Sequence, residues 1–415
     1  MRRMIALLVV CGIAISLTAC QKDLNKKEPV ITQEIRFQVL PLGRTKTLEN
    51  IVERYNAEHP QVKIVVEETD TKQIMSPTQY LREELPADIV LFSSGEPGDL
   101  KQLEKEDLLL DLNISLQSLE SSLPPALLAG SILNDKQIVV PVSINPSVMY
   151  YNKRLFERAG LDMPGDDWTW EQYDSYSRAI DQLGTDIYGS QLSFVFPPFP
   201  NQFSWLVQNS GNSIQSTDGW YQDYIDSPET VHVAQWLYNY FKHNKGKSME
   251  SFPRFEEGIV GMSGRAMDTE LYNKPNSTVE LGIATWPHFE GTARANPASY
   301  VYYGISSKSK APKEAWKFLE YLYFNANDDA VALAHANYTV PVFEPLREAA
   351  RKGADETAEL YYREAEYAYT MPISPRNPIW SDKALSMFSE IWTSPIDEIQ
   401  QRLHEVGVEL DKLEG

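Results

Sequence analysis

The sequence predicts a mixed α/β fold divided into two lobes. The chain has 415 residues, which is more than one hydrophobic core usually holds and favours two or three structural units. Strand and helix patterns alternate through residues 34–145, helix signals and aromatic residues dominate residues 147–280, and the alternating pattern returns near residue 300. One α/β lobe interrupted by a second lobe accounts for this order.

The first lobe is predicted to begin with a strand, a helix and a second strand. Apolar and polar residues alternate over 35–39, as in a strand with one buried face. Apolar residues then recur at helical spacing, with Thr47 as the candidate N-cap and Pro60 at the end. Further strands are predicted at 62–66 and at 87–92, the latter a short apolar run typical of a buried parallel strand.

The loops that follow the first and third of these strands are candidate ligand contacts. The β-α-β order predicts right-handed connections and a parallel arrangement. In such sheets ligands bind beyond the carboxyl ends of the strands. The loops cover residues 41–44 and 93–96, and their candidate side chains are Arg44, Ser93, Ser94 and Glu96.

The middle of the chain carries the helix signals of a second lobe. Residues 169–172 (TWEQ) form a Thr-x-x-Gln capping box, and another helix is predicted over 226–241. A strand follows at 279–284. The pattern of the first lobe then returns with a strand at 300–306 and a helix that begins at Pro312.

The N-terminal residues have the composition of a targeting segment. Arg2 and Arg3 precede an apolar stretch of 13 residues, which is too short to span a bilayer as a helix. The stretch ends in Leu-Thr-Ala-Cys at 17–20, which resembles the bacterial lipoprotein box, so we expect Cys20 to be lipidated and to become the new N-terminus. An ordinary signal peptide with a chance cysteine is the alternative. Cys11 would be removed with the leader, so no disulfide is expected.

The charge balance argues against two classes of partner. The chain carries 38 Lys and Arg residues against 58 Asp and Glu, a formal net charge of −20. Nucleic acids and anionic membrane surfaces both attract basic proteins. Neither is therefore expected as the main partner, and a neutral ligand fits the balance.

The sequence offers no catalytic or metal-binding motif. The six histidines include no pair at metal-ligand spacing. Residues 261–264 (GMSG) invite comparison with a nucleophile elbow, but Arg265 stands where that motif requires glycine. We therefore expect no catalytic residues, no metal and no cofactor.

Aromatic residues in polar segments are further candidates for ligand contact. Trp205, Trp286, Tyr302 and Trp380 lie in segments rich in Pro, Asn and Ser. Aromatic faces suit sugars, whose C–H faces stack on the ring while neighbouring polar groups bond to the hydroxyls. Packing of each ring under its own loop is the alternative. Four such segments in one chain favour a ligand cleft.

Several stretches of the chain are similar to one protein family. The most specific is residues 150–161 (YYNKRLFERAGL), which is followed by WTWE at 168–171. Other matching pieces occur in the same order at 86–90, 255–262, 304–319 and 339–342. Together they resemble the extracellular solute-binding proteins of bacterial ABC importers, in the family that binds carbohydrates, over roughly residues 34–410. The departures lie in binding loops: Ser210 stands where the family often has glycine, and Asp268 and Glu270 where it commonly has Gly or Trp.

This resemblance implies a two-lobe periplasmic-binding-protein-like fold of type II. The lobes would be joined by a hinge with two or three chain crossings, at 142–147, 298–304 and 340–345. The expected division is a leader at 1–20, a tether at 21–33, an N-terminal lobe of 34–145 plus 301–345, and a C-terminal lobe of 146–300 plus 346–415.

The resemblance also implies a function. The protein would close on a sugar or oligosaccharide and deliver it to the transmembrane subunits of an ABC permease, as a monomer anchored through Cys20 on the extracellular face of the cell membrane. Alternatives are a non-sugar solute such as a peptide, polyamine or iron complex, a sensor that signals to a histidine kinase, and an extracellular carbohydrate-active enzyme. The candidate ligand-binding residues are Arg44, Ser93, Ser94, Glu96, Asn145, Tyr150, Trp205, Asp268, Trp286, Tyr300, Tyr302 and Trp380.

Overall fold

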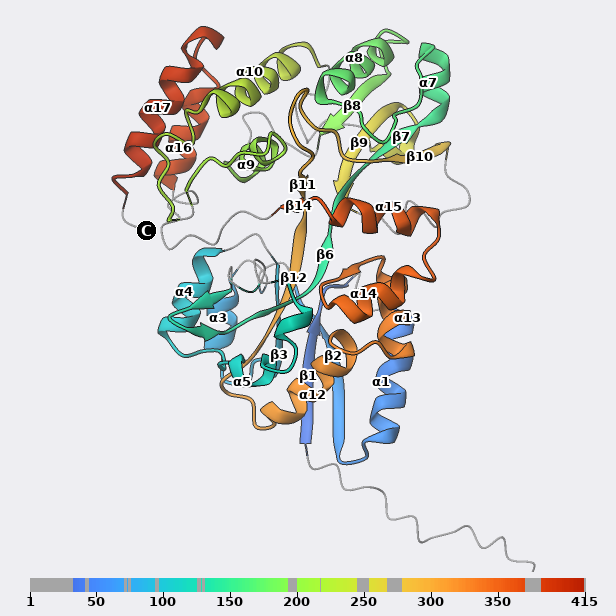
Figure 1. Cartoon of the computed structure of the whole chain (residues 1–415), viewed down its shortest axis with the longest axis vertical. Coiled ribbons are helices and arrows are strands. Elements are labelled where there is room, and N and C mark those ends of the chain that lie inside the picture. The colour runs from blue at the N-terminus through green and yellow to red at the C-terminus, as the bar shows by residue number, and fades with distance from the viewer. Residues whose placement is uncertain are drawn as a thin grey trace, which may run out of the picture.

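The computed structural model has two lobes of mixed α/β structure, one above the other in Figure 1, as the sequence predicts. Each lobe is built on its own β-sheet, and β6 (Val140–Asn145) of the first lobe leads directly into β7 (Ser147–Asn152) of the second. The structure describes residues 33–41, 45–70, 73, 76–93, 97–124, 128, 131–192, 200–216, 218–244, 254–266, 278–369 and 382–413.

The first lobe is built on a sheet whose described strands follow the order β13-β6-β12-β3-β1-β2. The β1, β2 and β3 strands pair in parallel, whereas β12 runs antiparallel to both β3 and β6. The three parallel strands confirm the predicted β-α-β arrangement. The strands are β1 (Gln33–Val39), β2 (Val62–Glu68), β3 (Ile89–Ser93), β12 (Ser299–Ile305) and β13 (Val340–Pro341), with a separate pair β4 (Ile132–Leu133) and β5 (Lys136–Gln137).

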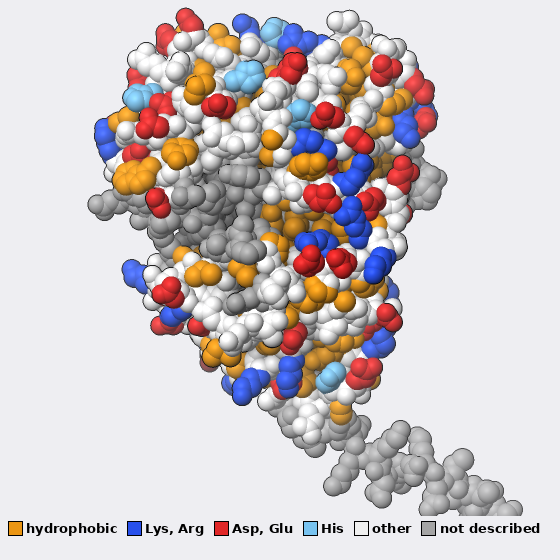
Figure 2. Space-filling model, viewed as in Figure 1, with side chains coloured by type: hydrophobic (Ala, Val, Ile, Leu, Met, Phe, Trp, Pro, Cys, Tyr) orange, Lys and Arg blue, Asp and Glu red, His pale blue; other side chains and the backbone are white. Residues whose placement is uncertain are grey.

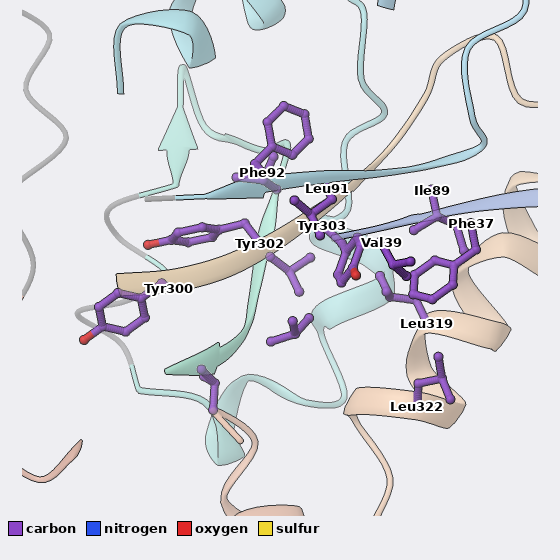
Figure 3. Packing of buried hydrophobic residues seen from close by; sticks show 14 of the residues in the cluster. Phe37, Val39, Ile89, Leu91, Phe92, Tyr300, Tyr302, Tyr303, Leu319 and Leu322 are labelled. Carbon is purple, nitrogen blue, oxygen red and sulfur yellow. The ribbon is translucent and has the colours of Figure 1, made fainter. Parts of the chain in front are cut away.

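Alternation along β1 places Ile35, Phe37 and Val39 in the core of this lobe, each at most 2% exposed. The Phe37 ring lies edge-on to Phe318, with centroids 5.4 Å apart, and its centroid is 5.2 Å from that of Tyr303. Figure 3 shows Phe37 and Tyr303 side by side in the core. The helices of this lobe are α1 (Lys46–Glu58), α3 (Pro77–Arg82), α4 (Pro97–Lys105), α5 (Asn113–Leu116), α12 (Pro312–Tyr323), α13 (Asp328–Asn337), α14 (Glu344–Arg351) and α15 (Glu356–Ala365).

Helix α1 begins earlier than the sequence predicts. Thr45 is the N-cap in place of Thr47, because its side chain accepts a hydrogen bond from the backbone N–H of Leu48 at 3.2 Å. Its backbone is extended, with φ −85° and ψ 158°, as an N-cap requires. Thr47 therefore lies inside the first turn. The helix ends before Pro60, as expected.

The second lobe is built on a sheet of the order β10-β7-β9-β8, formed with β8 (Tyr188–Leu192), β9 (Val260–Ala266) and β10 (Leu281–Ala284). The predicted capping box of Thr169 and Gln172 is present at the start of α8. Aromatic rings fill the core, where Trp170 packs edge-on against Trp286 with centroids 5.4 Å apart. The helices are α7 (Lys153–Ala159), α8 (Trp170–Asp181), α9 (Pro200–Gln208), α10 (Pro228–His243), α16 (Asp382–Ile391) and α17 (Ile399–Leu410).

The first connection between the lobes is Pro146, the single residue between β6 and β7. Helix α7 then begins after Asn152 and ends at Gly160, whose φ of 66° is left-handed and favours glycine. The Asn152 side chain makes no capping bond, and it donates to the carbonyl of Gly258 at 3.1 Å.

The later connections run past two short paired strands. The second lies between β10 and β12, where β11 (Asn296–Pro297) pairs in parallel with β14 (Ala368–Tyr369). The sequence-based division places residues from 346 onward in the second lobe. In the structure, Leu346 of α14 and Leu360 of α15 belong to the same cluster of buried side chains as Phe37. The same cluster also includes Val148 and Tyr150 of β7, and Tyr361 of α15 lies against Tyr150. Helix α15 therefore packs at the junction of the lobes.

Candidate functional site

Segments that join the two lobes meet at a buried carboxylate, Glu364 of α15. Its side chain is 1% exposed. It accepts hydrogen bonds from Asn296 Nδ2 at 2.6 Å and from the backbone N–H of Trp286 at 3.3 Å, and it pairs with the guanidinium of Arg294. Burial raises the pKa of Glu364, and Arg294 and Asn296 act in the opposite direction. These contacts hold α15 to the segment between β10 and β12.

A second set of bonds holds the first connection to the same segment. Asn296 Oδ1 accepts from the backbone N–H of Ser147 at 2.8 Å, and its Nδ2 donates to the carbonyl of Ser147, also at 2.8 Å. The Ser147 hydroxyl donates to the carbonyl of Pro297 at 3.0 Å. Asn296 thus bonds to both β7 and Glu364. We call Glu364, Arg294, Asn296 and Ser147 the hinge network.

Asn209, directly after helix α9, extends these contacts into the second lobe. Its Oδ1 accepts from the indole N–H of Trp286 at 2.7 Å, and its Nδ2 donates to the carbonyl of Ala295 at 2.5 Å. Because Asn209 is fully buried, both bonds form away from competing water. The end of α9 is therefore fixed relative to the hinge network.

Trp286, a predicted ligand contact, is 6% exposed in this structure. Its ring packs on Trp170, and its backbone and indole N–H groups are both bonded within the protein. A Cβ atom at Gly264 would lie 2.9 Å from the Trp286 ring, so only glycine leaves room for it there. Stacking on a ligand needs an accessible ring face, and little of this one is accessible.

Tyr300 and Tyr302, two more predicted contacts, lie on one face of β12. Their ring centroids are 6.2 Å apart, and Figure 3 shows both hydroxyls pointing the same way, away from the core residues Phe37 and Leu319. Their side chains are largely buried. Burial raises the pKa of Tyr302 to about 12 and raises that of Tyr300 as well. Both hydroxyls are therefore neutral and able to donate and accept hydrogen bonds at ordinary pH.

Asn145 and Tyr150 lie at the first connection. Asn145 ends β6 and is opposite Ser299 in the sheet register. Tyr150, on β7, is completely buried, and its hydroxyl lies 3.1 Å from that of Tyr361 on α15. This pair links the second lobe's sheet to α15. Tyr150 thus has the position of a structural contact between lobes.

Two aromatic side chains near the hinge network remain partly exposed. Trp205, predicted to lie in a loop, is on α9, where its ring is 38% exposed while Phe203 and Leu206 are buried. Tyr367 is 40% exposed, and the guanidinium of Arg294 lies over its ring at 4.3 Å from the centroid. Sequence reasoning missed Tyr367, because no motif marks it and its partner is distant in sequence.

The other predicted site residues either have only their backbone pairing described or lie outside the described residues. Ser93 is the last residue of β3 and pairs with Val301 of β12 through its backbone. Arg44, Ser94, Glu96, Asp268, Trp380 and Cys20 lie outside the described residues.

On the face seen in Figure 2, acidic and basic side chains are interspersed over both lobes. Among the described residues, no group of three or more His, Cys, Asp or Glu side chains is placed to hold a metal ion. None of the helices in the described ranges has the length and apolar character that a bilayer crossing requires.

Known proteins match this chain in sequence. A profile of the family described as bacterial extracellular solute-binding protein matches residues 42–329. Binding proteins of Brucella abortus (strain 2308) and Brucella suis biovar 1 (strain 1330) are each 26% identical over 212 residues, which is 47% of this chain and 49% of theirs. The chain spans about half the length of the curated relatives it matches.

Solved structures match over almost the whole chain. An ABC substrate-binding protein from Listeria monocytogenes, in complex with cycloalternan, has a TM-score of 0.71 at 18% identity and covers 91% of this chain and 98% of its own. The cyclic α-maltosyl-1,6-maltose binding protein from Arthrobacter globiformis has a TM-score of 0.74 at 18% identity, over 91% and 99%. Maltose-bound MalE3 of T. maritima has a TM-score of 0.68 at 18% identity, over 91% and 98%. These structures share the fold, and because the family profile covers most of the sequence, this chain belongs to the bacterial extracellular solute-binding protein family.

Proposed function

We propose that this protein captures a sugar or oligosaccharide by closure of its lobes and delivers it to an ABC permease. The observation that carries the proposal is the pair of neutral tyrosine hydroxyls on β12, beside a hinge network that joins two separate lobes. Uncharged hydroxyls on aromatic rings suit a neutral, hydroxyl-rich ligand. Structurally similar proteins bound to cycloalternan or maltose support the same ligand class.

Closure would follow from the ligand's preference for the closed arrangement. A ligand that contacts both lobes binds the closed state more tightly and shifts the population toward it. The hinge network would stay intact during this movement, because its polar groups are buried and losing their bonds would be costly. The movement would then occur by small backbone rotations on either side of the network.

We assign the predicted contacts to two roles. Tyr300 and Tyr302 would bond to sugar hydroxyls, and Trp205 would offer a ring face. Tyr367, which the sequence did not predict, would offer a second ring face. Tyr150 and Trp286 would position the lobes and α9, because the Tyr150 hydroxyl lies against that of Tyr361 and both N–H groups of Trp286 are bonded within the protein. The remaining proposed contacts, from the loops and the ends of β3 and β6, are Arg44, Ser93, Ser94, Glu96, Asn145, Asp268 and Trp380.

Binding and its specificity are tested by calorimetry and thermal unfolding of the purified protein. We expect maltose or cycloalternan to raise the unfolding temperature and to titrate with one site, whereas spermidine and a tripeptide have no effect. Chromatography should recover the sugar unchanged, since we propose that the protein is not an enzyme. If only spermidine or the tripeptide stabilised the protein, its ligand would be a solute of that class and not a sugar. Hydrolysis of the sugar would make the protein an enzyme.

The proposed anchor is a lipid on Cys20, which would hold a monomer on the extracellular face of the cell membrane. A lipid-modified cysteine partitions the protein into membranes. We expect a Cys20→Ala variant, expressed in a bacterium with lipoprotein processing, to be released from the membrane fraction, and mass spectrometry to find lipid only on the unsubstituted protein. Equal membrane retention of both proteins would contradict this anchor.

A further inference from the structure

A cavity of about 170 Å³ lies beside the hinge, between α13, α15 and the connection of α14 to α15. It is separate from the face of β12 that carries Tyr300 and Tyr302, neither of which lines it. The space exists because small residues line it. They are Ala334 on α13, Gly353 and Ala354 in the connection, and Ala358 on α15.

Three aromatic rings also line the cavity. Tyr338, Tyr361 and Tyr362 all line the cavity. Tyr338 ends α13 in the left-handed conformation, with φ of 49°, which is uncommon for a residue of its size. Its backbone there bonds to the carbonyls of Ala334 and His335. The unusual conformation thus occurs at a residue that lines the cavity.

The polar groups of the cavity favour a neutral occupant. The Asp355 carboxylate accepts a hydrogen bond from the backbone N–H of Ala358 at 2.8 Å, as the N-cap of α15. The His335 Nε2 atom lies 2.7 Å from the carbonyl of Ala350, to which it donates. Both groups are therefore engaged with the backbone. Three further lining residues, Tyr338, Tyr361 and Tyr362, carry a hydroxyl group, and a tyrosine hydroxyl can bond to a hydroxyl on a ligand.

The cavity lies next to the lobe junction. Tyr361 lines it and also places its hydroxyl 3.1 Å from that of Tyr150, on β7 of the second lobe. Val340 lines it as well and pairs with Ile144 of β6, close to the first connection. An occupant that moved Tyr361 would therefore act on the contact between α15 and the second lobe.

We propose that this cavity is a second ligand site, which takes a small neutral ring bearing a hydroxyl and is coupled to the lobe junction through Tyr361. Its size fits this class, because an apolar protein cavity of about 150 Å³ accepts benzene. Tyrosine rings at the wall offer edge and face contacts to such a ring. The site is independent of the proposed sugar site and does not rest on it.

Occupancy is tested with phenol as the probe, by calorimetry on the full chain. We expect saturable binding with a dissociation constant on the order of 1 mM. Ala358→Leu fills the cavity and should weaken phenol binding by roughly tenfold or more. Ala332→Leu, at an exposed position of α13 outside the cavity, should leave it unchanged. Absence of saturable binding, equal binding by Ala358→Leu, or equal binding of glycerol would overturn the proposal.

Coupling is tested by hydrogen exchange of the amides of residues 144–152, with and without phenol. We expect phenol to change their exchange rates in the unsubstituted protein. Tyr361→Phe keeps the ring and removes the hydroxyl that faces Tyr150, so it should still bind phenol but lose this change. An identical change in Tyr361→Phe, or none in either protein, would overturn the coupling. Sugar binding is not needed for either measurement, so the two proposals fail separately.

Discussion

The core around Phe37 and the junction around Glu364 are both buried, but different contacts hold them together. Phe37 is surrounded by rings such as Tyr303 and Phe318, and its packing depends on shape and apolar area. Glu364 is held by hydrogen bonds to Asn296 and Trp286 and by an ion pair with Arg294. The burial of apolar surface has no preferred direction, whereas hydrogen bonds do.

The core and the hinge network therefore contribute differently to the structure. The core supplies most of the stability of the first lobe, because burial of apolar surface is the main driving force for folding. The hinge network adds less net stability, since desolvation of its charged groups offsets much of their attraction. It fixes the relative positions of the segments that connect the lobes. We expect substitutions in the two regions to differ accordingly.

The largest loss of stability is expected for Phe37→Ala. Removal of this fully buried ring leaves a cavity among rigid neighbours and should reduce the free energy of unfolding by about 3–5 kcal/mol. Urea unfolding followed by circular dichroism measures the change. Ile114→Ala is the control, because Ile114 is 89% exposed, and should change stability by less than about 0.5 kcal/mol. Similar losses in both variants would mean that the ring does not pack as described.

A smaller loss is expected for Glu364→Ala. It leaves the guanidinium of Arg294 without its counter-charge and removes acceptors from Asn296 and Trp286, so unfolding free energy should fall by about 2–3 kcal/mol. Glu364→Gln is the matched variant, because its amide oxygen can still accept one of these bonds, and it should lose less. Equal unfolding free energies of the two variants would mean that hydrogen bonding by the side chain at position 364 does not stabilise the protein.

The stability that Glu364 contributes beside Arg294 should change with pH in a defined direction. Because burial raises the folded-state pKa of Glu364 above the ordinary value of 4.5, the folded protein binds this proton more tightly than the unfolded chain does. The resulting stability is present below pH 4.5 and is lost as pH rises through the folded-state pKa. The stability of the unsubstituted protein relative to Glu364→Gln should therefore fall as pH is raised from about 4 to about 7. A relative stability that rises over this range would mean that Arg294 outweighs burial.

The smallest effect is expected on ligand affinity. Tyr302→Phe removes one proposed hydrogen bond and should weaken sugar binding by about 0.5–1.5 kcal/mol in calorimetry. Tyr303→Phe is the matched control on the neighbouring residue of β12, which points to the opposite face and packs on Phe37. It should leave sugar affinity unchanged. If Tyr303→Phe weakened sugar binding more than Tyr302→Phe did, the ligand would lie on the other face of β12.

Local patterns in the sequence predicted much of the fold. Alternation gave the strand through Phe37, and the spacing of Thr169 and Gln172 gave the start of α8. Local patterns could not place α14 and α15. The apolar positions Leu346 and Leu360 show that each helix has a buried face, but not which lobe covers it.

The site was harder to predict for a similar reason. The contacts at the hinge join residues far apart in the chain, such as Asn209 with Trp286 and Arg294 with Glu364. Composition singled out Trp286 as aromatic and in a polar segment, but a ring that packs in a core and a ring that stacks on a ligand have the same local sequence. Only the three-dimensional neighbours distinguish them.

Small-angle X-ray scattering of the purified protein tests the closure of two lobes on a sugar most directly. Scattering is recorded without ligand and with saturating maltose or cycloalternan, whichever binds in calorimetry. Closure brings the lobes together, so the radius of gyration should fall when the sugar is bound. An unchanged radius of gyration at saturation would contradict capture by hinge closure.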